Sequence, residues 1–280
     1  MLSRRAVIGA TLALVGSPAW AAPSAAPLAP DMRRIRERGR LIVALGAGGL
    51  PPFVTDAGEG APHGFDVELA HGMAEALGVA LDFDRSARSG DDIIDRVASG
   101  AVDLGLSRLV VTLSRAERVR FSQPYLVLHH ALLFNRPRLA QIAAGREPLD
   151  VLRNGDGPLA IVAGSGAGEA ARRLLPRAQL KEFPRWDPEL VAAVLDGSVL
   201  AGWGDEIEAR RTLTQQPEAP LRLRATTLPT TSERIAVALP WESRQLLAWV
   251  DLYLETALTP VTPDELLARE TPGDAPATRR

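Results

Sequence analysis

A glycine-rich loop is one place where this sequence has the chemistry to bind an anion. It reads Gly164-Ser165-Gly166-Ala167-Gly168-Glu169 and lies between an apolar run, Leu159–Ala163, and a predicted helix, Glu169–Leu175. The first amides of a helix have no partner within the helix, so such a loop can hold a phosphate or a carboxylate. A dinucleotide fingerprint requires Gly or Ala at the position of Glu169, where a carboxylate would repel a pyrophosphate. The loop therefore predicts a carboxylate rather than a nucleotide.

The residue types that perform most covalent and metal chemistry are scarce. The chain has no cysteine, which excludes disulfides, thiolate zinc sites, iron–sulfur clusters and cysteine nucleophiles. Lys181 is the only lysine, and it lies in neither a phosphate-binding loop nor a Schiff-base context. The histidines, His63, His71, His129 and His130, lack the spacing of a chelating set. We therefore expect no metal and no cofactor.

The composition indicates a globular protein and argues against nucleic-acid binding. Of the 280 residues, 46% are apolar and 24% are charged, which is typical of a globular protein with one large or two modest domains. The 34 acidic residues outnumber the 32 basic ones. Nucleic acids normally bind to basic surfaces, so we expect no nucleic-acid partner.

The first residues follow the pattern of an export signal. Arg4 and Arg5 precede the apolar run Ala6–Gly16, and the small residues of Ser17–Ala22 follow it. The run is shorter than the ~20 apolar residues that span a bilayer. We expect cleavage after Ala21 and a periplasmic mature protein, with both the Sec and the twin-arginine routes open.

Short apolar runs alternate with amphipathic segments along the mature chain. The predicted strands are Leu41–Leu45, Val79–Phe83, Val102–Leu106, Leu159–Ala163, Val199–Trp203 and Arg234–Leu239. The predicted helices are Asp31–Arg36, Leu69–Leu77, Ile93–Val97, Glu169–Leu175, Leu190–Leu195 and Ser243–Ala257. This alternation indicates an α/β fold with mainly parallel sheets.

Three segments have a distinctive order and spacing. They are Gly64–Ala70 with Leu77-Gly78-Val79; Gly100–Leu104 with Thr112–Arg115 and Phe121–Tyr125; and Ala201–Asp205 with Arg234–Val237. Together they resemble the extracytoplasmic solute-binding proteins of polar amino-acid ABC importers, family 3, across about residues 33–258. The resemblance implies a type II periplasmic-binding-protein fold, in which two α/β lobes joined by two crossing strands hold the ligand between them. It also implies a monomer that passes a small-molecule ligand, an amino acid or a related carboxylate, to ABC permease subunits.

The resemblance also implies domain limits. They are a signal peptide at 1–21, lobe one at 31–130 plus 237–265, lobe two at 131–236, and a tail at 266–280. The crossing segments would be Ala131–Arg136 and Arg234–Ala238.

Two charged residues are the main candidates for ligand binding. A free α-amino acid carries a carboxylate and an ammonium, and removing either from water is costly without a charged or strongly hydrogen-bonding partner. The resemblance assigns the carboxylate to Arg115 and the ammonium to Asp205, one on each lobe. Asp205 also fits the N-cap of a helix that begins at Glu206, and the two roles are compatible.

Five further positions are implied as ligand contacts: Phe53, Val110, Thr112, Ser165 and Gly166. Phe53 fits a plain core position nearly as well. Thr112 fits a helix cap as well as a donor to the carboxylate. Ser165 and Gly166 open a helix whose free amides suit a carboxylate.

The sequence departs from the family pattern beside these positions. Val110 stands where many members have a hydroxyl, so only its backbone amide can donate. Arg108 stands where a small residue is common. A large cation close to the carboxylate site puts a standard amino acid in doubt and leaves room for an acidic or carboxylate-rich ligand. For Asp66, a helix cap or a structural hydrogen bond is a better expectation than ligand contact.

Two other functions fit the same resemblance. The periplasmic cyclohexadienyl dehydratases resemble these binding proteins, and Glu169 or Glu206 would then supply a general acid. A sensor that relays ligand binding to a membrane receptor would use the same fold. We expect the receptor of an importer, which is not an enzyme and has no catalytic residue.

Overall fold

The computed structural model describes residues 27–56, 61–215 and 219–269. The predicted export signal and the last part of the predicted tail lie outside these described residues. Within the described ranges, no helix combines the length and the apolar character that crossing a bilayer requires.

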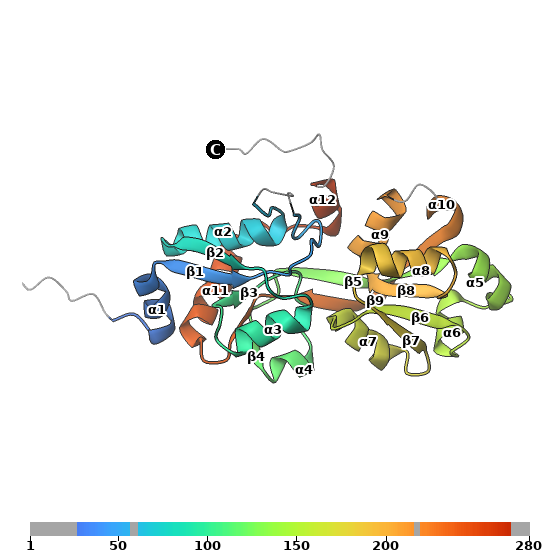
Figure 1. The fold of residues 1–280 in the computed structure, drawn as a ribbon, viewed down its shortest axis with the longest axis horizontal. Coiled ribbons are helices and arrows are strands. Elements are labelled where there is room, and N and C mark those ends of the chain that lie inside the picture. Colours follow the sequence, from blue (N-terminus) through green and yellow to red (C-terminus); the bar gives the residue numbers. More distant parts are fainter. Residues whose placement is uncertain (1–26, 57–60, 216–218, 270–280) are drawn as a thin grey trace, which may run out of the picture.

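The first of two five-stranded sheets forms lobe one (Figure 1). Its strands, in spatial order, are β2 (Ala80–Asp84), β1 (Arg40–Ala44), β3 (Leu104–Gly105), β10 (Ala238–Pro240) and β4 (Val119–Phe121). The helices of this lobe are α1 (Pro30–Arg38), α2 (Phe65–Leu77), α3 (Gly90–Ala98), α4 (Leu113–Ala116), α11 (Arg244–Thr256) and α12 (Pro263–Ala268).

The second sheet forms lobe two. Its strands, in spatial order, are β7 (Gln179–Phe183), β6 (Pro158–Val162), β8 (Ala201–Asp205), β5 (Leu126–Asn135) and β9 (Leu223–Ile235). The helices are α5 (Arg136–Ala143), α6 (Pro148–Arg153), α7 (Gly166–Leu174), α8 (Val191–Leu195) with the preceding turn η1 (Trp186–Leu190), α9 (Glu206–Gln215) and α10 (Ala219–Arg222).

The predicted two-lobe α/β class is confirmed. In each sheet three neighbouring strands pair in parallel, namely β2, β1 and β3 in lobe one and β7, β6 and β8 in lobe two. One strand in each sheet runs opposite to the other four and forms two antiparallel pairs, β10 with β3 and β4 in lobe one and β5 with β8 and β9 in lobe two. Each sheet is therefore mixed.

The long strands β5 and β9 connect the lobes. Leu126–His129 pairs with Ser232–Ile235 before β5 reaches β8, whereas Ala131–Phe134 already lies between β8 and β9. The first crossing segment therefore precedes the predicted Ala131–Arg136. Apolar residues lie on both sides of His129 and His130, so the hydrophobic pattern does not mark the point where the strand leaves one lobe. A register shift between His129 and Ala131 marks a β-bulge.

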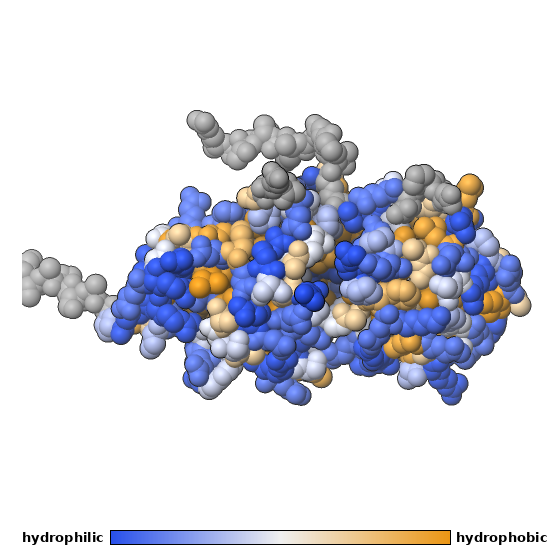
Figure 2. Space-filling model, in the orientation of Figure 1, coloured by the Kyte–Doolittle hydropathy of each residue, from blue (hydrophilic) through white to orange (hydrophobic). Residues whose placement is uncertain are grey.

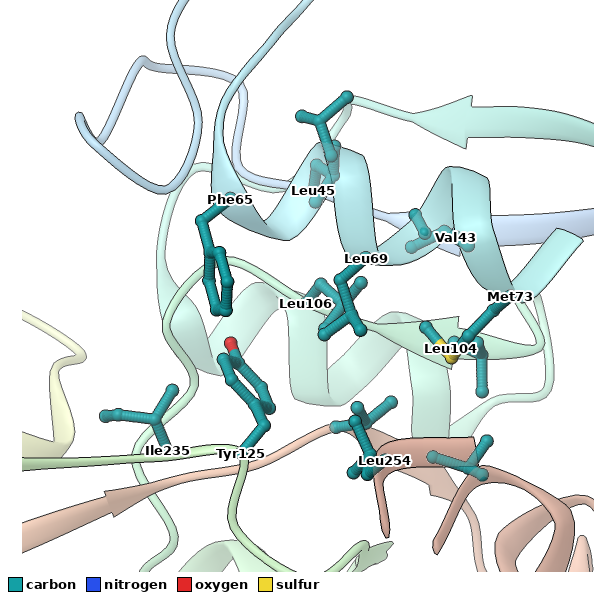
Figure 3. Packing of buried hydrophobic residues seen from close by; sticks show 14 of the residues in the cluster. Val43, Leu45, Phe65, Leu69, Met73, Leu104, Leu106, Tyr125, Ile235 and Leu254 are labelled. Carbon is teal, nitrogen blue, oxygen red and sulfur yellow. The ribbon is translucent and has the colours of Figure 1, made fainter. Parts of the chain in front are cut away.

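Each lobe has its own hydrophobic core. In lobe one, α2 places Phe65, Leu69, Met73 and Leu77 at i, i+4 spacing, and these side chains face the sheet (Figure 3). Gly78 ends α2 with a φ of 64°, a left-handed conformation that glycine adopts without strain. Lobe two has two clusters that include Trp203 and Trp186. Hydrophobic residues appear only in scattered patches among the hydrophilic surface of the face in Figure 2.

The C-terminal helix α12 belongs to the body of the molecule. Thr262 and Glu265 form a capping box at its start. Leu266 is fully buried in the core of lobe one. The predicted start of the tail at residue 266 therefore falls inside a packed helix.

Candidate functional site

A cavity of about 550 Å³ lies between the two lobes. Lobe one contributes the loops that follow β1 and β3 and the start of α3, and lobe two contributes the loops that follow β6 and β7. The cavity thus lies beyond the carboxyl ends of parallel strands from both sheets. Ligands of open α/β sheets generally bind at this edge.

The cavity wall carries more positive than negative side chains. Its charged residues are Arg88, Arg108, Arg115, Arg185, Glu189 and Glu208. Arg185 and Glu189 are paired, with 3.2 Å between Nε and Oε2. The remaining wall is mostly apolar or glycine, so charge is concentrated at a few arginines.

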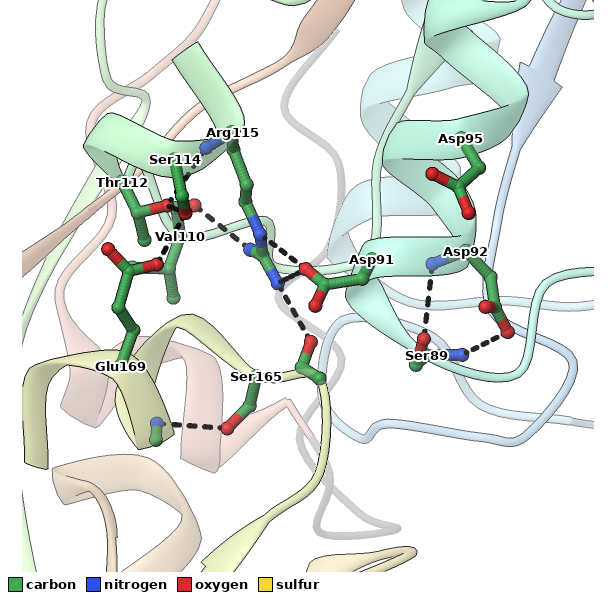
Figure 4. Close-up of polar contacts among 12 residues, drawn as sticks. Ser89, Asp91, Asp92, Asp95, Val110, Thr112, Ser114, Arg115, Ser165 and Glu169 are labelled. Atoms are coloured by element: carbon green, nitrogen blue, oxygen red, sulfur yellow. Dashed lines mark hydrogen bonds and ion pairs between the residues drawn. The ribbon is translucent and has the colours of Figure 1, made fainter. Parts of the chain in front are cut away.

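Arg115 lies at the cavity, as predicted, and reaches from lobe one to lobe two (Figure 4). Its Nε donates to Asp91 Oδ1 at 3.0 Å, its Nη1 to the Val110 carbonyl at 3.0 Å, and its Nη2 to the Gly164 carbonyl at 2.9 Å. Nη2 also lies 2.9 Å from Asp91 Oδ1. The side chain is 6% exposed, and three of its five N–H groups donate the hydrogen bonds described here.

Asp66, at the start of α2, fixes the loop that carries Arg108. Its Oδ2 accepts hydrogen bonds from the amides of Ser107 (2.9 Å) and Arg108 (2.6 Å), and its Oδ1 accepts one from the Tyr125 hydroxyl (2.8 Å). Burial raises the pKa of Asp66 from 3.8 to about 6, against the lowering effect of these hydrogen bonds. The expected structural role of Asp66 is confirmed, since all these contacts are within lobe one.

Arg108 itself crosses to lobe two. Its guanidinium forms ion pairs with Asp205 and with Glu208, the latter at 2.9 Å between Nη2 and Oε1. The guanidinium carbon lies 6.0 Å from the centre of the Phe53 ring. The side chain is 11% exposed. Arg108 therefore pairs with Asp205, the acidic residue that was expected to meet the ligand ammonium, and also with Glu208.

Asp205 is fully buried and caps α9. Its Oδ1 accepts hydrogen bonds from the amides of Ile207 (2.8 Å) and Glu208 (2.9 Å), and its Oδ2 faces Arg108. Asp205 is not among the residues that line the cavity, whereas Glu208 is. The structure thus has the helix-cap arrangement, and ammonium binding by Asp205 stays a prediction.

The other predicted contacts divide into two groups. Val110, Ser165 and Gly166 line the cavity. Ser165 also caps α7, because its hydroxyl accepts from the Gly168 amide at 3.0 Å. Phe53 and Thr112 are not among the lining residues. Phe53 is 1% exposed in the lobe-one core, and Thr112 caps α4, so the structural alternatives describe both.

Several wall residues were missed by sequence reasoning. Arg88, Ser89 and Gly90 precede or begin α3, and Trp186 begins the turn after β7. A sequence pattern could have identified Arg88, Ser89 and Gly90, since Ser89 and Asp92 have the spacing of a capping box after a strand. Such a helix start at the carboxyl end of a parallel strand is a common place for a site.

A buried pair of titratable residues lies on the crossing strands. His130 Nδ1 and Glu233 Oε2 are 3.5 Å apart, and both side chains are nearly inaccessible. The imidazole ring also packs on Trp203, with 5.1 Å between ring centres. Burial raises the pKa of Glu233 from 4.5 to about 7 and lowers the pKa of His130 from 6.5 to about 4. Both groups therefore favour their neutral forms.

The two glutamates considered as general acids lie elsewhere. Glu169 accepts a hydrogen bond from the Ser114 hydroxyl at 2.6 Å, which is a further contact between the lobes. Glu206 contacts His129 and Arg210. Neither glutamate lines the cavity.

Comparison with known proteins identifies the family. The family model of the bacterial extracellular solute-binding proteins, family 3, matches residues 42–266. The chain belongs to this family. A solved structure of a candidate binding component of an ABC transporter from Wolinella succinogenes, complexed with lysine, is 28% identical with a TM-score of 0.68. That match covers 83% of this chain and 95% of the other.

Two proteins whose names describe enzymes also match parts of the chain. The cyclohexadienyl dehydratase of Pseudomonas aeruginosa is 30% identical over 189 residues, which is 66% of each chain. The membrane-bound lytic murein transglycosylase F of Maricaulis maris is 32% identical over 146 residues, which is 52% of this chain and 30% of that protein. The chain thus spans about a third of the length of this last relative.

Proposed function

We propose that this family-3 protein is a receptor that binds one small carboxylate-bearing solute between its lobes and delivers it to the permease of an ABC importer. The observation that carries the proposal is the interlobe cavity of about 550 Å³ with the Arg115 guanidinium on its wall. A cavity of this size suits a single small molecule. A ligand that contacts both lobes stabilises the closed form by its higher affinity for that form.

Arg115 supports a carboxylate in the ligand. A guanidinium offers a carboxylate two parallel N–H donors, which a lysine cannot do. Asp91 occupies that position here, but the Asp91 side chain is 55% exposed. It can therefore exchange the contact for water when a ligand carboxylate takes its place. The first-turn amides of α7, beside Ser165 and Gly166, provide further donors on the lobe-two side.

The proposal is tested by substitution of Arg115. Because Arg115→Ala removes the guanidinium that would pair with the ligand carboxylate, we expect affinity for the bound carboxylate to fall at least about 30-fold. Isothermal titration calorimetry with amino acids, oxo acids and hydroxy acids measures this directly. Arg118→Ala is the matched control, since Arg118 is 48% exposed and pairs with Asp95 at the surface. Equal affinity of Arg115→Ala and the natural protein would contradict the proposal.

The proposed function also includes export of the protein and an interaction with permease subunits. The family is extracellular, and we propose that the leader is cleaved after Ala21 and that the monomer works in the periplasm. Mass spectrometry of the secreted protein tests the cleavage point. Co-purification with the permease subunits distinguishes delivery to an importer from signalling to a membrane receptor.

A dehydratase activity is the alternative that similarity to the Pseudomonas aeruginosa enzyme raises. Glu169 and Glu206, the acids considered for it, contact Ser114 and Arg210 away from the cavity wall. This placement favours the receptor. Incubation of the pure protein with prephenate or arogenate, followed by ultraviolet detection of the aromatic product, is the direct check.

A further inference from the structure

Arg108 pairs with two acidic residues of lobe two near the cavity, Asp205 and Glu208. Asp205 Oδ1 accepts two backbone amides of α9, and its Oδ2 pairs with Arg108. Glu208 Oε1 pairs with Arg108 at 2.9 Å, and its Oε2 accepts the Asp205 amide at 3.4 Å. Each of the four carboxylate oxygens therefore already has a partner within the protein.

Among the described residues, the carboxylates near this wall are already paired, so an ammonium group would find none of them free. The other acidic residue there, Glu189, is paired with Arg185. A ligand ammonium could reach Asp205 or Glu208 only by displacing a buried guanidinium, and the displaced cation would then need another partner. Two like charges in a desolvated site repel strongly.

The same wall is well equipped for an anion. Arg88 lines the cavity, and its guanidinium contacts no acceptor within the described part of the chain. The amides of Gly166 and Ala167, in the first turn of α7, lie on the opposite lobe at the same cavity. Apolar side chains between these donors, among them Ile93, Val110 and Val162, suit a hydrocarbon body.

We propose that Arg108 is a built-in counter-ion for Asp205 and Glu208, and that the cavity therefore selects organic carboxylates that carry no α-ammonium group, such as 2-hydroxy or 2-oxo acids with an apolar side chain. This inference rests on the proposed receptor function and specifies its ligand class. Arg108 thus acts as the residue that sets specificity.

The backbone conformation at Arg108 supports the proposed role of this residue, and it also indicates a substitution that should leave the loop unchanged. Ser107 and Arg108 have φ values of 98° and 49°, in a region where residues other than glycine are strained. Asp66 holds both amides in this conformation. Arg108→Gly should keep the loop, because glycine adopts such φ values easily and the amide remains. Arg108→Asn, which also tolerates a left-handed backbone, is the second variant.

The test compares ligands that differ only at the α-substituent. Calorimetry with L-phenylalanine against 3-phenyllactate, and with L-leucine against 2-hydroxy-4-methylpentanoate, gives a preference ratio for each protein. We expect the natural protein to prefer the hydroxy acid by at least about tenfold, and Arg108→Gly and Arg108→Asn to reverse the preference. Arg88→Gly is the matched control, because it removes the same charge from the same wall without freeing Asp205 or Glu208. Its ratio should stay unchanged while both affinities fall.

The outcomes separate this inference from the receptor proposal. Tighter binding of the amino acid by the natural protein, with the same ratio in Arg108→Gly, overturns the inference and leaves the receptor proposal standing. Failure of both ligand classes to bind the natural protein and every folded variant counts against the receptor proposal itself, and the inference falls with it. Circular dichroism and thermal unfolding show that the variants are folded.

Discussion

At the scale of single residues, Asp66 connects the core of lobe one to the cavity. Its carboxyl group has three hydrogen-bond donors around it, two of them the backbone amides of Ser107 and Arg108. Burial nevertheless raises its pKa to about 6, so desolvation outweighs the donors. Arg108 reaches lobe two only because this buried group holds its backbone.

We predict that Asp66→Ala lowers the free energy of unfolding by about 2–4 kcal/mol, because it leaves two buried amides and the Tyr125 hydroxyl without an acceptor. Asp66→Asn keeps an acceptor oxygen of the same shape and should lower it much less. Urea denaturation followed by circular dichroism measures both values. Equal losses for the two variants would show that hydrogen bonding is not the reason for the effect.

Sequence reasoning identified the role of a residue best where that role depends on residues only a few positions away in the sequence. The resemblance carried by the spacing from Thr112 to Arg115 and on to Phe121 pointed to Arg115, which lies on the cavity wall, and its binding of a carboxylate stays a prediction. The caps formed by Thr112, Ser165 and Asp205 were also foreseeable, because a cap involves residues two or three apart. The pairing of Arg108 with Glu208 was not foreseeable, since 100 positions separate them and no short pattern encodes that contact.

At the scale of elements, the alternation of apolar runs and amphipathic segments was sufficient to predict an α/β fold with mainly parallel sheets, whereas the two-lobe arrangement came from the resemblance to solute-binding proteins. The alternation was insufficient for β5, where one mostly apolar strand serves both the connection and the lobe-two sheet, and for β9, whose sequence is mostly polar. Hydrophobic patterning indicates burial, and β5 is mostly buried in both of its parts. The antiparallel strands follow from the path of the chain between lobes, which residue patterns do not contain.

The crossing strands also carry a pH-sensitive group, Glu233. The folded protein keeps the proton of this carboxyl group up to about pH 7, whereas the unfolded chain loses it near pH 4.5. Stability therefore falls as pH rises between these values and is level above them. Arg108 partly offsets the effect of burial, and Glu208 adds to it. The difference between the two pKa values corresponds to about 3 kcal/mol.

We predict that Glu233→Gln, which cannot ionise, gains stability relative to the natural protein as the pH rises. The gain between pH 4.5 and pH 8 should approach about 3 kcal/mol, because only the natural protein must bury a charge at the higher pH. Asp66 and His130 titrate in both proteins, so their contributions largely cancel. Urea denaturation at several pH values gives the two curves. A constant gap between them would refute the prediction.

At the scale of the whole molecule, several contacts hold the lobes together around the cavity. Arg115 donates to the Gly164 carbonyl, Ser114 donates to Glu169, and Arg108 pairs with two acids of lobe two. Gly166 lies close against Val110 across the interface, since a Cβ on Gly166 would lie 2.5 Å from Val110 Cβ. The closed arrangement therefore depends on the missing side chain at position 166.

We predict that Gly166→Ala keeps the lobes from closing fully. The added methyl would meet Val110 across the interface, and such overpacking typically costs about 1–3 kcal/mol, which corresponds to a loss of affinity of roughly tenfold or more. Small-angle X-ray scattering with the tightest-binding carboxylate at saturation should show a larger radius of gyration than for the natural protein. Gly48→Ala is the control, because it lies on the same wall with nothing within 4 Å of its Cβ. Identical scattering and affinity in Gly166→Ala would exclude this steric limit.

The paired strands between the lobes also determine the direction in which the molecule can deform. β5 and β9 are joined from Leu126 opposite Ile235 to Asn135 opposite Leu223, with one interruption at the bulge beside His130. Sliding one strand along the other would break the whole ladder of backbone hydrogen bonds, whereas flexing at the bulge changes only a few dihedral angles. The paired strands β5 and β9 thus resist sliding along each other but allow bending. The two lobes can therefore approach each other by rotation about an axis that crosses the ribbon formed by β5 and β9.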